Sequence, residues 1–262
     1  MNIAIIGYGQ MGKMLEQKAL AQGHTVVAIV DPFASDAKPL CAAPLFPSIT
    51  QAGDLCGAEV ALEFTQPDTA FANIKALAEK KIPMVVGSTG WYDRLDEARQ
   101  AVESAGTALI WASNFSLGVY LFNRIAWYAA QLFDSFPEYD IGGFEAHHNK
   151  KLDSPSGTAK TLVNGVLARV GRKDTAVWET LDRSPQPGEL HYPSLRLGSM
   201  PGIHSLLFDS PADTIEITHT ARNREGLAYG ALRAAQWLAG PATDGKGRKG
   251  FFTVEDMLKD IV

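Results

Sequence analysis

The sequence predicts an α/β domain built on a parallel sheet, joined to an α+β domain with a mixed or antiparallel sheet. In the first part of the chain, short apolar strands and amphipathic helices alternate up to about residue 116. Farther along, residues 202–208 and 213–219 are two strand-like runs separated only by a short turn. Alternation with helices is typical of parallel strands, whereas a direct strand–turn–strand connection favours antiparallel pairing.

The beginning of the chain carries the pattern of a Rossmann dinucleotide-binding domain. Residues 2–6 form a β-branched apolar run, and a helical pattern follows a glycine-rich loop. Gly7 allows the tight turn, Gly9 lets a pyrophosphate approach the backbone, and Gly12 packs helix on strand. The alternative is a glycine turn without a ligand. The predicted cofactor loop comprises Gly7, Tyr8, Gly9, Gln10, Met11 and Gly12.

The acid that ends the second strand bears on the choice of cofactor. Asp31 follows the strand-like run 25–30. A carboxylate there accepts hydrogen bonds from ribose hydroxyls and repels the 2′-phosphate of NADP. Pro32 and Phe33 offer no arginine to offset that repulsion, although Lys38 offers a positive charge nearby. The pattern therefore predicts NADH or NADPH as cofactor and favours NADH.

Three more strands extend the first domain, over residues 59–64, 83–86 and 108–111, with helices over 67–80 and 92–104. Ligands of an open parallel sheet bind beyond the carboxyl ends of its strands. The segments that follow the last two strands are therefore expected to contact the nicotinamide half of the cofactor, the alternative being ordinary turn residues. These segments contain Gly87, Ser88, Thr89, Ala112, Ser113, Asn114 and Phe115.

The pattern changes after the first domain. A long apolar helix is expected over 117–133, then a strand over 139–146 and a helix over 160–170. The segment 184–202 is rich in Pro and Gly and is expected to be a long loop, before the predicted hairpin.

Two closing helices, over 227–238 and from Val254, are expected to return to the first domain. We therefore divide the chain into a dinucleotide-binding domain of residues 1–117, completed by 226–262, and a second domain of residues 118–225.

The stretch 145–159 has the composition of a site that protonates an anionic substrate. A histidine such as His147 has a pKa near neutrality and can give or take a proton. Lys151 adds fixed positive charge. A helix is expected to begin at Ser156-Gly157-Thr158, and free N–H groups at a helix N-terminus bind anions.

Two simpler interpretations of this stretch are a polar surface loop and a metal site. Successive residues of a strand point to opposite faces, so His147 and His148 cannot easily share one ion. No cysteine or third histidine lies nearby at ligand spacing. We predict no metal.

Composition excludes several classes of protein. The 262 residues are 46% hydrophobic and 20% charged, as in a globular protein. A formal charge of −5 argues against a nucleic-acid binder, and no apolar run has membrane-spanning length. The first strand leaves no room for a signal peptide, and Cys41 and Cys56 lack metal or redox spacing. A cytoplasmic protein with reduced cysteines is expected, the alternative being a disulfide between them.

The stretch from Glu145 to Ala159 resembles the signature of the dihydrodipicolinate reductase family. It reads Glu145-Ala146-His147-His148-x-x-Lys151-x-Asp153-Ser154-Pro155-Ser156-Gly157-Thr158-Ala159. Supporting matches follow the family's order through nearly the whole chain: Gly87-Ser88-Thr89-Gly90, Ser113-Asn114-Phe115-Ser116, Gly202-x-His204, and His219-x-Ala221-x-x-Arg224 followed by Gly230-Ala231.

The resemblance implies a two-domain enzyme of lysine and diaminopimelate biosynthesis that reduces 4-hydroxy-tetrahydrodipicolinate with a nicotinamide cofactor. It implies that His147 is the catalytic acid and Lys151 a second proton donor or charge partner. It further implies that His148, Gly157 and Thr158 hold the carboxylates of this cyclic dicarboxylate. Members of the family are commonly homotetramers joined through the sheet of the second domain, and domain closure is expected to bring nicotinamide and substrate together.

The chain departs from the family pattern at three places. Many members have a longer glycine loop with an arginine before its methionine, where this chain has Gln10. Pro32 stands where a basic residue is common, and Ile203 where an acidic residue is common before His204. The first two differences remove positive charge from the expected 2′-phosphate site, which again favours NADH.

Two other functions account for part of the sequence. Another two-domain dehydrogenase, such as a diaminopimelate dehydrogenase or a sugar oxidoreductase, would share the Rossmann half, so only the second domain discriminates. A non-enzymatic NAD sensor would leave a proton donor, a lysine and an anion-binding turn without a role. The His-His-x-x-Lys and Ser-Gly-Thr elements favour the reductase over both.

Overall fold

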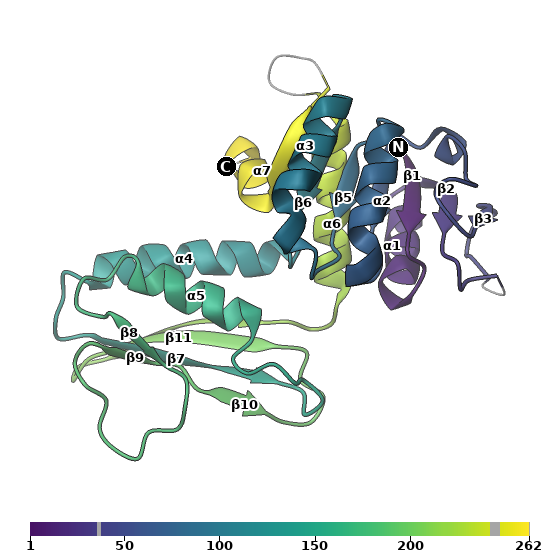
Figure 1. Ribbon diagram of the computed structural model, residues 1–262. Coiled ribbons are helices and arrows are strands. Elements are labelled where there is room, and N and C mark those ends of the chain that lie inside the picture. Colours follow the sequence, from purple (N-terminus) through teal and green to yellow (C-terminus); the bar gives the residue numbers. More distant parts are fainter. Residues whose placement is uncertain (36–37, 242–246, 262) are drawn as a thin grey trace. The chain divides into compact units, whose positions relative to one another are not determined.

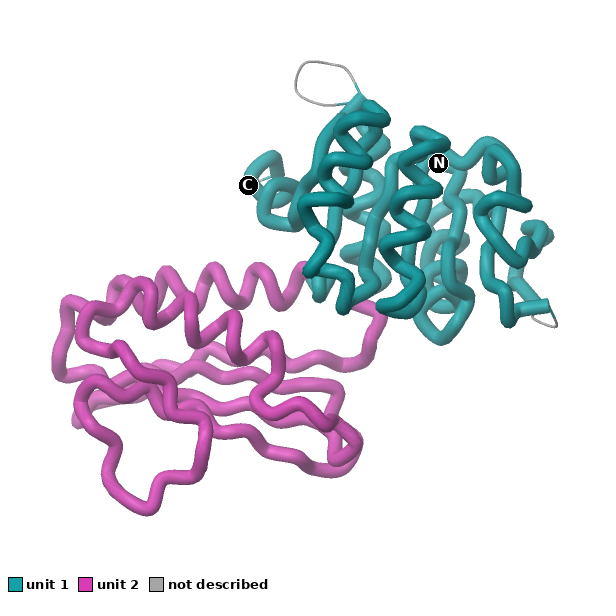
Figure 2. Tube along the Cα trace, viewed as in Figure 1, with its two compact units in different colours: residues 1–116, 227–262 teal, residues 117–226 magenta. Residues whose placement is uncertain are grey.

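The chain divides into two compact units, which Figure 2 distinguishes by colour. The computed structural model describes residues 1–35, 38–241 and 247–261. Unit 1 comprises residues 1–116 together with 227–262, and unit 2 comprises residues 117–226. The two units are described separately below.

Unit 1 is built on a parallel sheet. Among the described residues this sheet has seven strands in the order β13-β6-β5-β4-β1-β2-β3, and each neighbouring pair is parallel. The chain thus starts in the middle of the sheet and builds outward in both directions. The strands are β1 (Asn2–Ile6), β2 (Thr25–Val30), β3 (Leu45–Phe46), β4 (Val60–Glu63), β5 (Met84–Val86), β6 (Ala108–Trp111) and β13 (Gly250–Thr253).

Helices cover both faces of this sheet (Figure 1). Ala4 and Ile6 of β1 lie in one core with Ile74 and Leu77, which come from a helix on that face. Because side chains alternate along a strand, Ile5 points to the other face. The helical elements are α1 (Gln10–Ala21), η1 (Leu55–Gly57), α2 (Pro67–Glu79), η2 (Tyr92–Arg94), α3 (Leu95–Ala105), α6 (Glu225–Ala239) and α7 (Val254–Ile261).

Unit 2 is an α+β unit whose main sheet is mixed. Its strand order is β10-β7-β11-β12 among the described residues, with β10 parallel to β7 and the other pairs antiparallel. A separate parallel pair joins β8 and β9. The elements are α4 (Leu117–Phe133), β7 (Asp140–His147), α5 (Gly157–Leu167), β8 (Thr175–Val177), β9 (Glu189–His191), β10 (Ser194–Arg196), β11 (Ile203–Asp209) and β12 (Thr214–Thr220).

One face of the mixed sheet is covered by α4 and α5 (Figure 1). Ile141 of β7 and Leu206 and Phe208 of β11 are buried in a core with Phe122 of α4 and Leu162 of α5. Alternation along each strand therefore sorts the sheet residues into a helix-covered face and an opposite face.

The predicted fold class is confirmed by this topology. The parallel sheet carries the expected helices, and the two runs expected to form a hairpin pair in antiparallel register as β11 and β12. Their turn is closed by the Ser210 N–H, which donates to the Asp213 carbonyl at 2.9 Å.

Several expected elements differ from those observed. The segment 184–202 is not one long loop, because it contains β9 and β10. Each of these strands has only three residues, too few for a periodic pattern to stand out among prolines and glycines. The helix expected from residue 92 starts as the 3-10 turn η2. Of the two starts expected for the helix after residue 155, the structure has the one at Ser156-Gly157-Thr158 and not the one at residue 160. Edge strands β3 and β13 were not predicted.

Within the part of the chain that the structure describes, no helix is both long enough and apolar enough to cross a membrane.

Candidate active site

A row of polar side chains crosses the mixed sheet of unit 2 at one end. Strand register places Glu145 of β7 opposite His204 of β11, and His204 opposite His219 of β12. On the other side, Ser194 of β10 lies opposite Glu145. His147 follows Glu145 by two residues, so both side chains lie on the helix-covered face. Residues far apart in the sequence thus converge on one site.

Glu145 is fully buried and is held by three donors. Its Oε1 accepts hydrogen bonds from the Ser156 backbone N–H at 3.0 Å, the Ser194 hydroxyl at 2.7 Å and the Arg196 guanidinium at 3.1 Å. Burial by itself raises the pKa of the Glu145 carboxyl, but these hydrogen bonds outweigh it and lower that pKa below its ordinary value. Glu145 is therefore a buried carboxylate ion.

The second carboxylate oxygen faces two imidazole rings. Glu145 Oε2 lies 3.4 Å from His147 Nδ1 and 3.9 Å from His204 Nδ1. None of these three buried atoms has a hydrogen-bond partner among the described residues. One ligand atom from each residue also lies within 4.8 Å of the others, a spacing that a metal ion could fit. The spacing along the sequence placed no third histidine near His147 and His148. Strand pairing brings His204 to this position.

His147 combines burial with one accessible side. Only 8% of the residue is exposed, and burial lowers the pKa of its imidazole, against the opposing influence of Glu145. A Cβ atom at Gly202 would lie 3.1 Å from His147 Nε2, and the φ of Gly202 is +148°. Glycine at this position therefore avoids a side chain that would crowd Nε2, the nitrogen that points away from Glu145.

Lys151 and His148 lie in the segment after β7. The Lys151 ammonium is 2.8 Å from an oxygen of Asp153, and the Lys151 backbone N–H donates to the His148 carbonyl at 3.1 Å. His148 is held by its own N–H, which donates to the Met200 carbonyl at 2.8 Å, and its Nδ1 has no partner among the described residues. Lys150 is exposed. Lys151 is close enough to the histidine row for its charge to contribute to lowering the pKa of both His147 and His204.

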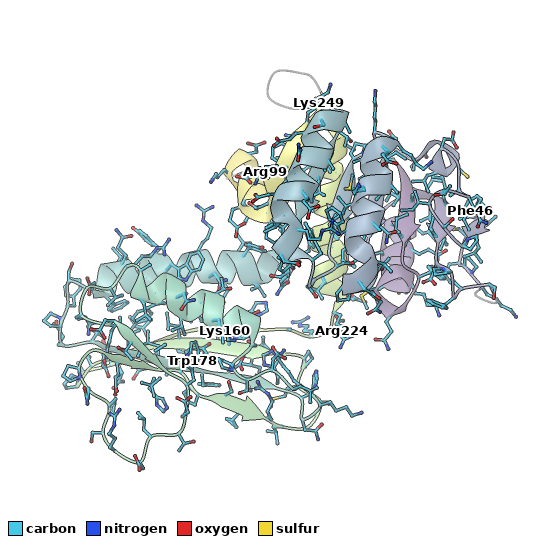
Figure 3. All side chains as sticks on the ribbon, in the orientation of Figure 1. Phe46, Arg99, Lys160, Trp178, Arg224 and Lys249 are labelled. Atoms are coloured by element: carbon cyan, nitrogen blue, oxygen red, sulfur yellow. The ribbon has the colours of Figure 1, made fainter. Side chains whose placement is uncertain are left out.

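Helix α5 begins where the sequence predicted an anion-binding turn. Ser156 is its N-cap, and the Ser156 hydroxyl accepts from the Ala159 N–H at 3.1 Å. The first N–H groups of a helix have no acceptor within it, so those of Gly157 and Thr158 can bind an anion. A Cβ atom at Gly157 would meet nothing within 4 Å, which shows that this end of the helix is open. Figure 3 marks Lys160 on the same helix.

The glycine loop of unit 1 has two closely packed glycines and an open one. At Gly7, an added Cβ atom would lie 2.4 Å from the Phe64 carbonyl oxygen. At Gly12, an added Cβ atom would lie 2.1 Å from the Gly7 carbonyl oxygen. Gly7 also has a φ of +92°. At Gly9, the N-cap of α1, nothing lies within 4 Å of such an atom. This division of roles agrees with a loop that admits a pyrophosphate at Gly9.

Asp31 fastens the glycine loop to the end of β2. Its two carboxylate oxygens accept from the Tyr8 backbone N–H at 2.7 Å and the Phe33 backbone N–H at 2.8 Å. The Tyr8 hydroxyl donates to the buried Glu16, so the Tyr8 ring points into the protein. Of Tyr8, only the backbone is placed to face a cofactor. Gln10 begins α1 at the same loop.

A pocket of about 230 Å³ lies beyond the carboxyl ends of β4, β5 and β6. It contains most of the residues that the sequence assigned to the nicotinamide half of the cofactor. Thr89 is exposed and does not line it. Three residues that line the pocket were not predicted: Phe64, Thr65 and Leu227. Phe64 and Thr65 follow strand β4, just as the predicted pocket residues follow β5 and β6. The lining residues are Met11, Phe64, Thr65, Gly87, Ser88, Ala112, Ser113, Asn114, Phe115 and Leu227.

Comparison with known families gives a consistent result over the whole chain. The protein-family model described as dihydrodipicolinate reductase, N-terminus, matches residues 1–115. The family model described as dihydrodipicolinate reductase, C-terminus, matches residues 118–258.

Two similar proteins carry names that agree with the family models. The 4-hydroxy-tetrahydrodipicolinate reductase of Christiangramia forsetii is 36% identical over 263 residues, covering 100% of this chain and 99% of that protein. The enzyme of the same name from Thiobacillus denitrificans is 35% identical over 269 residues, covering 98% and 97%.

A solved structure shares the fold. The dipicolinate-bound dihydrodipicolinate reductase from Paenisporosarcina sp. TG-14 has a TM-score of 0.74, with 97% of each chain covered and 21% sequence identity. At that identity the likeness supports the fold alone.

Proposed function

The chain belongs to the dihydrodipicolinate reductase family, and we propose that it reduces 4-hydroxy-tetrahydrodipicolinate to tetrahydrodipicolinate in lysine and diaminopimelate biosynthesis. The observation that carries this proposal is the buried Glu145–His147 pair beside the open N-terminus of α5. It combines a proton donor with donors for a carboxylate. That combination suits an anionic substrate that is protonated as it is reduced.

The cofactor is assigned to unit 1. The backbone of the glycine loop would take the pyrophosphate, Asp31 the ribose hydroxyls, and the pocket beyond β4–β6 the nicotinamide. The bound nicotinamide would supply the hydride. This chain's part is to hold the ring in a pocket lined by small residues and by the apolar side chains of Met11, Phe64, Phe115 and Leu227.

The proton is assigned to His147. Burial lowers the pKa of His147 in the free protein, and the two negative charges of the substrate would raise it again on binding. The acid would therefore become protonated when the substrate is in place. The Nε2 side of the ring, next to Gly202, is where the substrate carbon would lie.

The substrate carboxylates are assigned to the opening of α5 and to the segment before it. Gly157 and Thr158 would donate backbone N–H groups, next to the N-cap Ser156, and His148 would contribute a ring nitrogen. Lys151 would add positive charge, shared with Asp153.

The test of the overall reaction is a coupled assay with the product mixture of dihydrodipicolinate synthase. We expect loss of reduced-cofactor absorbance with NADH, and a KM for NADPH about tenfold higher, equivalent to about 1.4 kcal/mol of repulsion by Asp31. Equal use of both cofactors, or preference for NADPH, would contradict the assignment of Asp31. Binding of NADH without any oxidation would favour the rival function of an NAD sensor.

Replacing the proposed acid tests its role. We expect His147→Gln to lower kcat by about 10²–10⁴-fold, the usual contribution of a general acid, with NADH binding unchanged. His24→Gln, at a histidine of unit 1 that contacts Gln236, is the matched control and should keep full activity. A His147→Gln protein with unchanged kcat would remove His147 from the reaction.

The adjacent lysines provide a paired test of charge. Lys151→Ala should lower kcat/KM for the dicarboxylate by about 10–100-fold, the equivalent of losing one charged hydrogen bond of about 1.5–3 kcal/mol. Lys150→Ala, at the exposed neighbour, should change it little. NADH titration by fluorescence should give the same Kd for both variants. Equal loss of activity in both would argue for a general charge effect rather than a contact of Lys151.

We also propose a cytoplasmic homotetramer. Phe144, Leu195 and Leu207 lie on the sheet face opposite α4 and α5, where each is partly or largely exposed. Cys41 and Cys56 are both free, as in a reducing compartment. An apolar sheet face is suited to pairing with a second copy.

Light scattering of the purified protein tests this assembly. A mass four times that of the chain is expected, and Leu195→Lys should reduce it to that of one or two chains, because it places a charge on the proposed interface. Leu121→Lys is the matched control, since Leu121 is 47% exposed on α4 and Leu195 is 52% exposed on the sheet. A monomeric wild-type protein would contradict the proposal.

A further inference from the structure

The polar row of unit 2 contains three buried atoms that face one another without a partner. They are Glu145 Oε2, His147 Nδ1 and His204 Nδ1, and none has a hydrogen-bond partner among the described residues. The His147 and His204 rings meet edge to face, with centroids 5.2 Å apart. Buried polar atoms are nearly always hydrogen-bonded, so this convergence requires an explanation.

We propose that Glu145 is a positioning residue for His147, whose Nδ1–H it accepts, so that Nε2 is the nitrogen offered to the substrate. This inference rests on the proposed function, in which His147 is the acid. Glu145 Oε2 and His147 Nδ1 are 3.4 Å apart and are not hydrogen-bonded in the structure. A rotation of the ring that shortens this distance and directs the Nδ1–H at Oε2 would close the bond.

The Glu145 carboxylate is held in place by contacts other than the one with the His147 imidazole. Glu145 Oε1 is taken by the Ser156 N–H, the Ser194 hydroxyl and the Arg196 guanidinium, which come from the start of α5 and from β10. With one oxygen held from two elements, the other can point only toward the histidines. An ionised carboxylate has no proton to give, so it must be an acceptor there.

The environment of His204 also favours a proton on the ring nitrogen Nδ1 that faces Glu145. Burial lowers the pKa of His204 to about 4, so this ring is neutral near pH 7. A neutral imidazole with Nδ1 directed at a carboxylate is favourable only if Nδ1 carries the proton. Its Nδ1 lies 3.9 Å from Glu145 Oε2, farther than that of His147. His204 thus directs a second donor at the same oxygen, and His147 has the shorter contact.

The opposite edge of the His147 ring lies beside Gly202. A methyl group at Gly202 would crowd Nε2 at 3.1 Å, and glycine avoids that contact. The ring thus directs Nδ1 at Glu145, while Nε2 is not among the buried atoms that lack a partner. After Nε2 releases a proton, the Nδ1–H bond to Glu145 would keep Nε2 as the basic nitrogen, ready to accept the next proton.

Imidazole nitrogen shifts test this inference independently of turnover. Multiple-bond ¹H–¹⁵N spectra are recorded on ¹⁵N-labelled wild-type protein at a pH above the pKa of His147, where its ring is neutral. They should show the Nδ1–H tautomer of His147. The resonances are assigned by their loss in His147→Gln. In Glu145→Gln the amide NH2 would donate to Nδ1, so we expect the Nε2–H tautomer, with kcat reduced about 10–100-fold and the Kd for NADH unchanged.

Glu97→Gln is the control. Glu97 is exposed on α3 of unit 1, where its carboxylate accepts from the Arg94 guanidinium at 2.8 Å. This variant should keep both the tautomer and the activity. If Glu145→Gln does not fold, the wild-type spectrum alone still tests the contact.

The outcomes separate this inference from the proposed function. An Nε2–H tautomer of His147 in the wild type would overturn the inference, whether or not NADH is oxidised. Loss of activity on EDTA treatment, restored by zinc, would also overturn it, since the three atoms would then be metal ligands. An Nδ1–H tautomer in a protein that oxidises no NADH would support the contact and overturn the proposed function.

Discussion

The burial of one carboxylate organises the second unit. Glu145 is fully buried, and an unpaired ion in such surroundings would be strongly destabilising. Three donors from two segments compensate this charge: β10 supplies Ser194 and Arg196, and the start of α5 supplies the Ser156 N–H. The same contacts place the open end of α5 beside the histidines. The anion-binding turn and the proton donor are thus positioned by one electrostatic requirement.

Local sequence rules accounted for most of unit 1 because its chemistry is local. The turn at Gly7, the close packing at Gly12 and the acid at the end of β2 all belong to one β–α–β segment. The same holds for the start of α5, where Ser156 caps the helix as the Ser-Gly-Thr sequence predicted. A pattern contained within some thirty residues has few alternative structures, so reading it from sequence is reliable.

Strand register could not be read in the same way. His204 faces Glu145 only because β11 pairs with β7 at that register, and a shift of one residue would turn its ring to the opposite face. Ser194 and Arg196 were missed for a related reason, since β10 has three residues in a segment rich in Pro and Gly. The place of the 145–159 stretch, at the end of a strand and the start of a helix, was therefore predictable, whereas the partners that hold Glu145 were not.

The register also explains why three histidines can occupy one end of a sheet with a single carboxylate. Glu145, His204 and His219 are direct neighbours across β7, β11 and β12, and burial lowers the pKa of both His204 and His219. Neutral rings add no positive charge that would compete for the carboxylate. His147, two residues along β7, then has the shortest ring contact with it and its Nε2 edge beside Gly202. Of the three rings that share this face with the carboxylate, His147 is the one in a position both to be held by Glu145 and to meet a substrate.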